Sequence, residues 1–231
     1  MEHASALILT NARCVEFSSR TAKRCTLLIE NGVIARRGSG YHPRAKGVRV
    51  HDLEGRYVIP GFIDSHTHLV AEGIKMQRVD LRRCHSLDDC LNKIAASLKA
   101  DEIVFAVNWD ESSWRSGDTT SLDRRALDRI SRSKPIVMRR VCGHYAVANT
   151  AALRLIPARW KIVDREKGAL YEDVALNLND IFAPDDETVM RAVRLASAKA
   201  VRLGITSVHE ISNPRYFRIL QKERSRLRVR F

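Results

Sequence analysis

Short apolar runs separated by polar turns make up the first quarter of the chain. Residues 6–9 form one such run, and residues 25–30 and 33–35 lie on either side of Asn31-Gly32. Asn-Gly between two apolar runs is a strong signal of a two-residue β-hairpin, because both turn positions need positive φ. The pattern predicts a small β module over residues 1–59.

The next apolar run, Val58 to Ile63, contains Pro60-Gly61 and ends just before His66 and His68. Such a run predicts a strand buried on both sides. Because side chains alternate along a strand, the two imidazoles should lie on one face, a few ångströms apart, as a chelating pair. Two polar residues satisfied by water at a strand end are the plainer alternative.

Beyond His68 the pattern alternates between helices and strands. Ser86 is placed to cap an amphipathic helix, and Asp185 and Asp186 to cap another that Gly204 ends. Further helices are expected over residues 122–130 and 216–224, and strands over residues 103–107, 136–138, 205–210 and 227–231. The predicted fold class is α/β, because strands and helices alternate.

Composition is that of a folded protein without a membrane segment. The chain has 231 residues, 45% hydrophobic and 29% charged, and no apolar run approaches the length that crosses a bilayer. The N-terminus lacks the features of a secretory signal, so a cytoplasmic location is expected. Five cysteines without a C-x-x-C pair predict reduced thiols rather than disulfides.

The charge balance is unusual, with 40 Lys and Arg against 27 Asp and Glu and a formal net charge of +13. Such a surplus can indicate a nucleic-acid or anionic partner. The basic residues are scattered, however, and the densest stretch, 222–230, is explained equally well by a solvated helix face passing into a strand. Nucleic acid is therefore not the expected partner.

The segment Pro60-Gly61-Phe62-Ile63-Asp64, followed by His66 and His68, resembles the first-strand signature of the metal-dependent amidohydrolase superfamily. Further segments resemble the amidohydrolase family 3 branch, which carries an insertion after that strand. They are 108–114, 127–130, 135–140, 143–153 and 168–172. The likeness extends over nearly the whole chain.

This resemblance implies the N-terminal part of a TIM-barrel hydrolase. Residues 1–59 would form half of a composite β-sandwich, and residues 60–231 a partial (β/α) barrel with an insertion at about 80–183. The chain supplies about three of the eight strands that a barrel needs, so the barrel is expected to be incomplete.

The resemblance also assigns roles to particular residues. His66 and His68 would bind a divalent metal, with Zn²⁺ as the expected ion, and substrate-binding or supporting roles fall to a further set of residues. That set is Asp64, Trp109, His144, Glu172 and His209.

The residues themselves leave alternatives open for most of that set. Trp109 could instead anchor the core, and His144 could be a hydrogen-bonded core histidine. Glu172 could ligate a metal, orient a ligand or accept a proton. His209, with Glu210, ends a predicted strand, where polar residues are often merely solvated.

The expected activity is hydrolysis of non-peptide carbon–nitrogen bonds in a small amide-like substrate. The catalytic residues stay unknown, because the family's base and remaining metal ligands lie on strands beyond residue 231. The chain alone is expected to be a weak hydrolase or none, and to associate with itself or with a complementary chain. The alternative function is a catalytically inactive basic remnant that binds nucleic acid or a partner protein.

Overall fold

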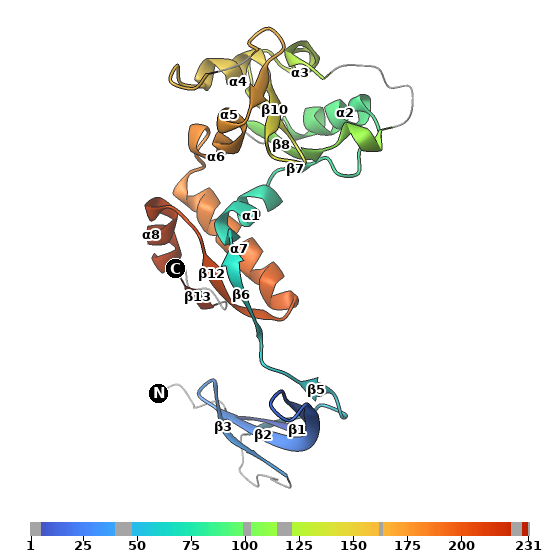
Figure 1. Ribbon diagram of the computed structural model, residues 1–231, viewed down its shortest axis with the longest axis vertical. Coiled ribbons are helices and arrows are strands. Elements are labelled where there is room, and N and C mark those ends of the chain that lie inside the picture. The colour runs from blue at the N-terminus through green and yellow to red at the C-terminus, as the bar shows by residue number, and fades with distance from the viewer. Residues whose placement is uncertain are drawn as a thin grey trace. The chain divides into compact units, whose positions relative to one another are not determined.

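A computed structural model describes residues 6–39, 48–98, 103–114, 122–161, 164–222 and 228–230. The chain divides into two compact units, Met1–Phe62 and Ile63–Phe231. Figure 1 shows the elements of each unit. Among the described residues, no helix is long and apolar enough to cross a membrane.

The first unit is a five-stranded sheet without helices in its described residues. Its strands are β1 (Leu7–Glu16), β2 (Thr21–Glu30), β3 (Val33–Gly38), β4 (Arg49–Asp52) and β5 (Tyr57–Val58). The order is β3-β2-β1-β4, and β5 also pairs with β1. The predicted hairpin between β2 and β3 is confirmed, with φ of 51° at Asn31 and 76° at Gly32. A small core lies on one side of the sheet, including the buried Ala12 and Leu27.

A disulfide joins Cys14 on β1 to Cys25 on β2. The expectation of reduced thiols is therefore wrong for this pair, whereas Cys84, Cys90 and Cys142 are free. The two cysteines are 11 residues apart in sequence, a separation that matches no disulfide framework. The antiparallel pairing of β1 with β2 brings their Cα atoms to 6.2 Å, which only the folded sheet could reveal.

The second unit contains the three-stranded sheet that carries the two histidines. Its order is β13-β12-β6, with β6 at Phe62–Thr67, β12 at Ile205–Glu210 and β13 at Arg228–Arg230. Helices α1 (Leu69–Met76), α7 (Asp186–Arg202) and α8 (Pro214–Lys222) pack together through a buried apolar cluster that includes Val70, Val193 and Ile219. Within the described residues this sheet stays open and does not close into a barrel.

Strand β6 is exposed, in contrast to the sequence expectation of burial on both faces. Phe62 is 57% and Ile63 65% exposed. In the described sheet β6 is an edge strand bonded to β12 alone, so no element covers its outer side. The strand that ends at the histidines is confirmed over Phe62–Thr67, whereas residues 59–61 of the predicted run lie outside any strand. Burial of a strand depends on what packs against it.

A glycine fixes how α1 rests on α7. A Cβ atom built on Gly73 would overlap the backbone carbonyl oxygen of Ala192. The two helix backbones thus approach each other more closely than any larger residue would permit. This contact holds the helix that begins directly after His68.

A second sheet, also in the second unit, has the order β11-β10-β9-β8-β7. Its strands are β7 (Val79–Asp80), β8 (Val104–Trp109), β9 (Ile136–Arg140), β10 (Tyr145–Ala148) and β11 (Ala169–Tyr171). Strands β7, β8 and β9 are parallel, and β10 and β11 continue antiparallel. The helices described around this sheet are α2 (Leu87–Ser97), the 3-10 helix η1 (Glu111–Ser113), α3 (Arg124–Ile130), α4 (Thr150–Leu155), α5 (Asp173–Leu176) and α6 (Leu178–Ile181).

The helix starts predicted from sequence are confirmed at two caps. Ser86 Oγ accepts the backbone N–H of Asp89, and the Asp185 carboxylate accepts that of Thr188. Each bond satisfies one of the N–H groups that a helix start leaves without a partner. Gly204, with φ of 81°, follows the end of α7 as expected.

Candidate functional site

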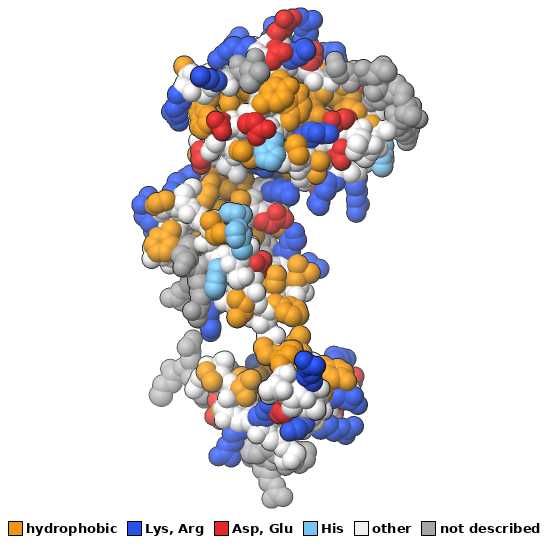
Figure 2. Space-filling view, in the orientation of Figure 1, with side chains coloured by type: hydrophobic (Ala, Val, Ile, Leu, Met, Phe, Trp, Pro, Cys, Tyr) orange, Lys and Arg blue, Asp and Glu red, His pale blue; other side chains and the backbone are white. Residues whose placement is uncertain are grey.

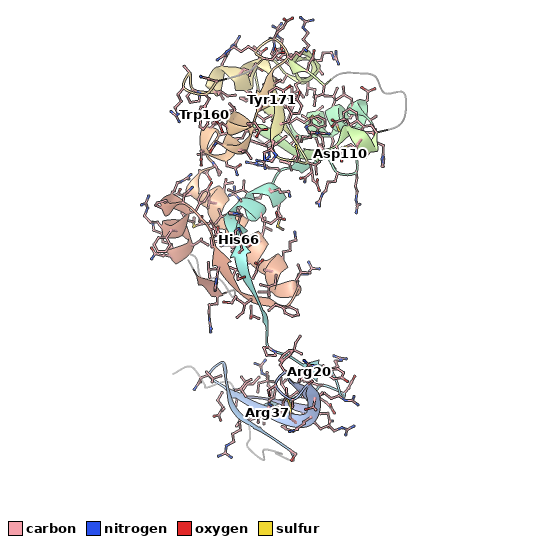
Figure 3. The ribbon with its side chains drawn as sticks, in the orientation of Figure 1. Arg20, Arg37, His66, Asp110, Trp160 and Tyr171 are labelled. Carbon is pink, nitrogen blue, oxygen red and sulfur yellow. A yellow bond between two sulfur atoms is a disulfide. The ribbon has the colours of Figure 1, made fainter. Side chains whose placement is uncertain are left out.

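His66 and His68 stand at the end of β6, where the chain passes into α1. Their ring centroids are 5.6 Å apart and the ring planes are inclined at 82°. Both side chains are exposed. Figure 3 labels His66 beside α1, and Figure 2 shows histidine side chains at the surface over this part of the unit. The predicted proximity of the two imidazoles is confirmed.

The ring of His68 is held by Ile211, the residue that directly follows β12. Its Nδ1 lies 3.0 Å from the backbone carbonyl oxygen of Ile211. A carbonyl can only accept, so Nδ1 carries the hydrogen, and in the neutral ring Nε2 then keeps its lone pair. Metal-binding histidines are commonly oriented by such a bond on the other ring nitrogen.

Glu210 ties the start of α1 to the same strand. Its carboxylate accepts the backbone N–H of Leu69 at 2.5 Å and that of Val70 at 3.4 Å. The side chain is 5% exposed, and this burial raises the pKa of the Glu210 carboxyl, while the two backbone donors oppose the rise. Glu210 thus satisfies two of the free N–H groups of α1 directly after His68.

The two histidines open onto a pocket of about 400 Å³. It is lined by His66, Thr67, His68, Ala71, Glu72, Lys75, Arg139 and Asn179. A second hollow of about 300 Å³ shares His68, Ala71 and Asn179 and includes Glu210 and Tyr216. The first volume falls in the range that accommodates a small organic molecule.

Sequence reasoning did not single out Arg139, Asn179 or the carbonyl of Ile211. Arg139 belongs to β9 and Asn179 to α6, so both come from the region of the second sheet. No short motif links them to His66 and His68. Glu210 could have been found from its place at the end of a predicted strand. His209 ends the same strand, so position alone did not distinguish the two residues.

Asp64 is close to the histidines in the fold as well as in sequence. It lies on β6 with its side chain partly buried, and its Oδ1 accepts the backbone N–H of His66 at 3.1 Å. This bond restrains the chain immediately before the histidine pair. The role given to Asp64 by resemblance stays a prediction.

Trp109 lies in the packed interior of the second sheet. It is 3% exposed, stacks near Trp114 and Tyr145, and has a buried indole Nε1 without a hydrogen-bond partner among the described residues. Arg140 lies 5.8 Å from its ring centroid. Trp109 does not line the histidine pocket.

His144 and Glu172 are neighbours, although 28 residues separate them in sequence. The backbone N–H of Glu172 donates to the carbonyl oxygen of His144 at 2.9 Å. His144 directly precedes β10, and Glu172 directly follows β11. Both side chains are exposed, and φ is 82° at Gly143 and 43° at Glu172. Neither residue lines the histidine pocket.

His209 lies on β12, between Val208 and Glu210. Its side chain is exposed, whereas Glu210 is buried and reaches α1. Because side chains alternate along a strand, His209 and Glu210 point to opposite faces. Glu210, and not His209, lines the hollow beside His68.

The donor set fits a divalent metal in part. Two imidazoles side by side, one with its Nε2 left available, suit Zn²⁺. Across the ranges the structure describes, no cluster of three or more His, Cys, Asp or Glu side chains is arranged to hold a metal. His66 and His68 therefore supply two ligands of a site.

These features define a mixed α/β chain with a histidine pair at the end of an exposed strand. The family model described as the amidohydrolase family matches residues 49–230. The chain belongs to this family, as the signature around His66 and His68 predicted.

Several known proteins resemble the chain. Protein LONG AFTER FAR-RED 3 of Arabidopsis thaliana is 28% identical over 230 residues, 91% of this chain and 39% of that protein. N-substituted formamide deformylase of Arthrobacter pascens is 28% identical over 158 residues, 65% of this chain and 29% of the enzyme. A metal-dependent hydrolase structure from Pyrococcus horikoshii aligns with a TM-score of 0.77 at 24% identity, covering 97% of this chain and 48% of that one. The chain thus spans less than half the length of these relatives.

Proposed function

We propose that this chain is part of a metal-dependent hydrolase that acts on a non-peptide carbon–nitrogen bond. The observation that carries the proposal is the pair of imidazoles with ring centroids 5.6 Å apart, in which His68 is bonded to the Ile211 carbonyl through Nδ1 and its Nε2 takes no part in that bond. Family membership and the name of one relative, N-substituted formamide deformylase, support an amide or formamide substrate.

In this proposal the residues of the chain bind the metal ion and orient its ligands. His66 and His68 would hold Zn²⁺ or a similar ion, which when bound lowers the pKa of water and polarises a carbonyl. Asp64 restrains the backbone at His66, and Ile211 and Glu210 fix His68 and the start of α1. The pocket of about 400 Å³ would receive the substrate next to both imidazoles.

Zn²⁺ binding to the purified chain tests the proposal. We expect calorimetry to detect one ion per chain, and His66→Ala or His68→Ala to weaken binding by at least about tenfold, because each removes one of few strong ligands. The exposed His51 on β4 provides the matched control, and His51→Ala should leave the affinity unchanged.

Hydrolysis of N-substituted formamides by the zinc-loaded chain provides the second readout. Any turnover should disappear in His68→Ala and persist in His51→Ala. Unchanged zinc stoichiometry and affinity in the double variant His66→Ala/His68→Ala would overturn the ligand assignment.

A further inference from the structure

The pocket beside the histidines is walled by residues from two sheets. His66 and His68 come from the end of β6, Lys75 from α1, and Arg139 from the end of β9. Arg139 is half-buried, so its charge is partly withdrawn from water. A partly desolvated guanidinium is stabilised by a counter-charge or by strong acceptors.

The other charges of the pocket already have partners. Glu72 lies 3.8 Å from Lys75 and 3.1 Å from Lys199, and so it is balanced by two ammonium groups. Arg139 has no ion-pair partner among the carboxylates that the structure describes. Burial lowers the pKa of Arg139, and no described carboxylate offsets that effect.

A second guanidinium, that of Arg78, lies near the same aromatic ring as Arg139. Arg78 stacks on the ring of Phe105 at 3.6 Å, and Arg139 lies 5.9 Å from the centre of the same ring. One nitrogen of Arg78, Nη1, is buried with no partner among the described atoms. Burial, and next the positive charge of Arg139, lowers the pKa of Arg78 to about 9. The pair thus places two positive charges around one aromatic ring.

Asn179 connects Arg78 to the pocket by a hydrogen bond. Its Oδ1 accepts Arg78 Nη2 at 2.5 Å, which leaves the amide NH₂ of Asn179 as the group that can donate. Asn179 and Arg139 both line the pocket. Their side chains therefore offer hydrogen-bond donors and positive charge to the pocket, where the carboxylate of Glu72 is already paired with Lys75 and Lys199.

We propose that Arg139, assisted by Asn179, binds a carboxylate of the substrate in the pocket that His66 and His68 line. The inference rests on the proposed function and narrows its substrate class to N-acyl or N-formyl compounds that carry a carboxylate. An Arg guanidinium binds a carboxylate through two parallel N–H bonds, which also fixes the orientation of the ligand. The carbon–nitrogen bond would then lie toward the two histidines.

Two probes of nearly equal shape distinguish the effect of the ligand's negative charge from the effect of its shape. N-formylglycine carries a carboxylate where N-formylglycinamide carries a neutral carboxamide. Each is titrated into the chain and followed by nuclear magnetic resonance, first with a metal chelator present and then with Zn²⁺. The chelated titration is decisive, because a carboxylate could otherwise bind the metal itself. We expect N-formylglycine to bind about tenfold more tightly than the amide in both states.

Variants test which cation is responsible. Arg139→Gln should abolish the preference for the carboxylate, and Arg139→Lys should retain part of it. The neighbouring Arg140 is the matched control, since its guanidinium is paired with Glu111 at 2.8 Å and does not line the pocket. Arg140→Gln should keep the full preference. Thermal unfolding of each variant verifies that the fold is intact, and Arg139→Lys keeps the test valid if Arg139→Gln is destabilised.

The outcomes distinguish this inference from the function it rests on. Equal binding of both probes, binding of neither, or a full preference in Arg139→Gln would overturn the carboxylate assignment even if Zn²⁺ binds to the histidines. If the wild-type chain failed to bind Zn²⁺ but still preferred the carboxylate probe through Arg139, the proposed hydrolase function would be rejected. The pocket would then remain an anion-binding pocket.

Discussion

The Nδ1 atom of His68 lies 3.0 Å from the backbone carbonyl oxygen of Ile211, across 143 residues of sequence. This bond selects the Nδ1–H tautomer and leaves Nε2 as the basic nitrogen. It also makes the orientation of the His68 ring, a candidate metal ligand, depend on the pairing of β6 with β12.

The tautomer of His68 can be measured directly. Nitrogen-15 spectra of the metal-free chain should show His68 with a protonated Nδ1 and an unprotonated Nε2 at pH values where the ring is neutral. Zn²⁺ should then shift the Nε2 resonance. The exposed His51 serves as an internal reference and should not respond to Zn²⁺. An Nε2-protonated His68 would contradict the ligand geometry.

Glu210 should make stability depend on pH in a particular direction. Its carboxyl pKa is raised in the fold, mainly by burial, so the folded state binds the proton more tightly than the unfolded state. The contribution of Glu210 to unfolding free energy is then largest below its ordinary pKa of 4.5 and falls as pH rises through the higher folded pKa. Urea unfolding of wild type and Glu210→Gln from pH 4 to 8 should show a difference that changes across this window.

Asp80 provides the control of opposite sign for that experiment. Hydrogen bonds from Arg82, and then from Asn108, hold the pKa of Asp80 well below its usual value. Its stabilisation is present above the unfolded pKa and is lost as pH falls below it, so the control requires the series to be extended below pH 4. Asp80→Asn should therefore reduce the acid sensitivity of the fold, and a Glu210→Gln difference independent of pH would contradict the raised pKa.

Replacing Gly73 should loosen the helix that follows the histidines. The added methyl of Gly73→Ala would overlap the carbonyl of Ala192 on α7, so the helices must separate. We expect a loss of about 1–3 kcal/mol in unfolding free energy, measured with urea. Gly38→Ala is the control, because a Cβ there meets no atom within 4 Å. Equal stability of the two variants would mean that α1 does not contact α7 as described.

The disulfide should stabilise the β module. Cys14→Ser or Cys25→Ser is expected to lower the unfolding free energy by about 2–3 kcal/mol, because the bond constrains a short loop of the unfolded chain. Cys142→Ser, at an exposed free thiol, should have little effect. Free-thiol titration of the unfolded, non-reduced chain should give three thiols. Five thiols would show that the bond is absent.

The sequence by itself determined the local elements of this protein. The hairpin at Asn31-Gly32, the helix starts at Ser86 and Asp185, and the proximity of His66 and His68 each depend on residues a few positions apart. Turn chemistry, capping and strand alternation act over that range, so a linear pattern contains them. Family membership likewise followed from short motifs along most of the chain.

Tertiary structure decided what surrounds the histidines. Ile211 and Glu210 reach His68 and Leu69 from more than 140 residues away, and Arg139 joins the pocket from another sheet. The exposure of β6 and the disulfide between Cys14 and Cys25 were also decided at this level. Strand pairing and helix docking create these contacts, and no local pattern records which distant residues they bring together.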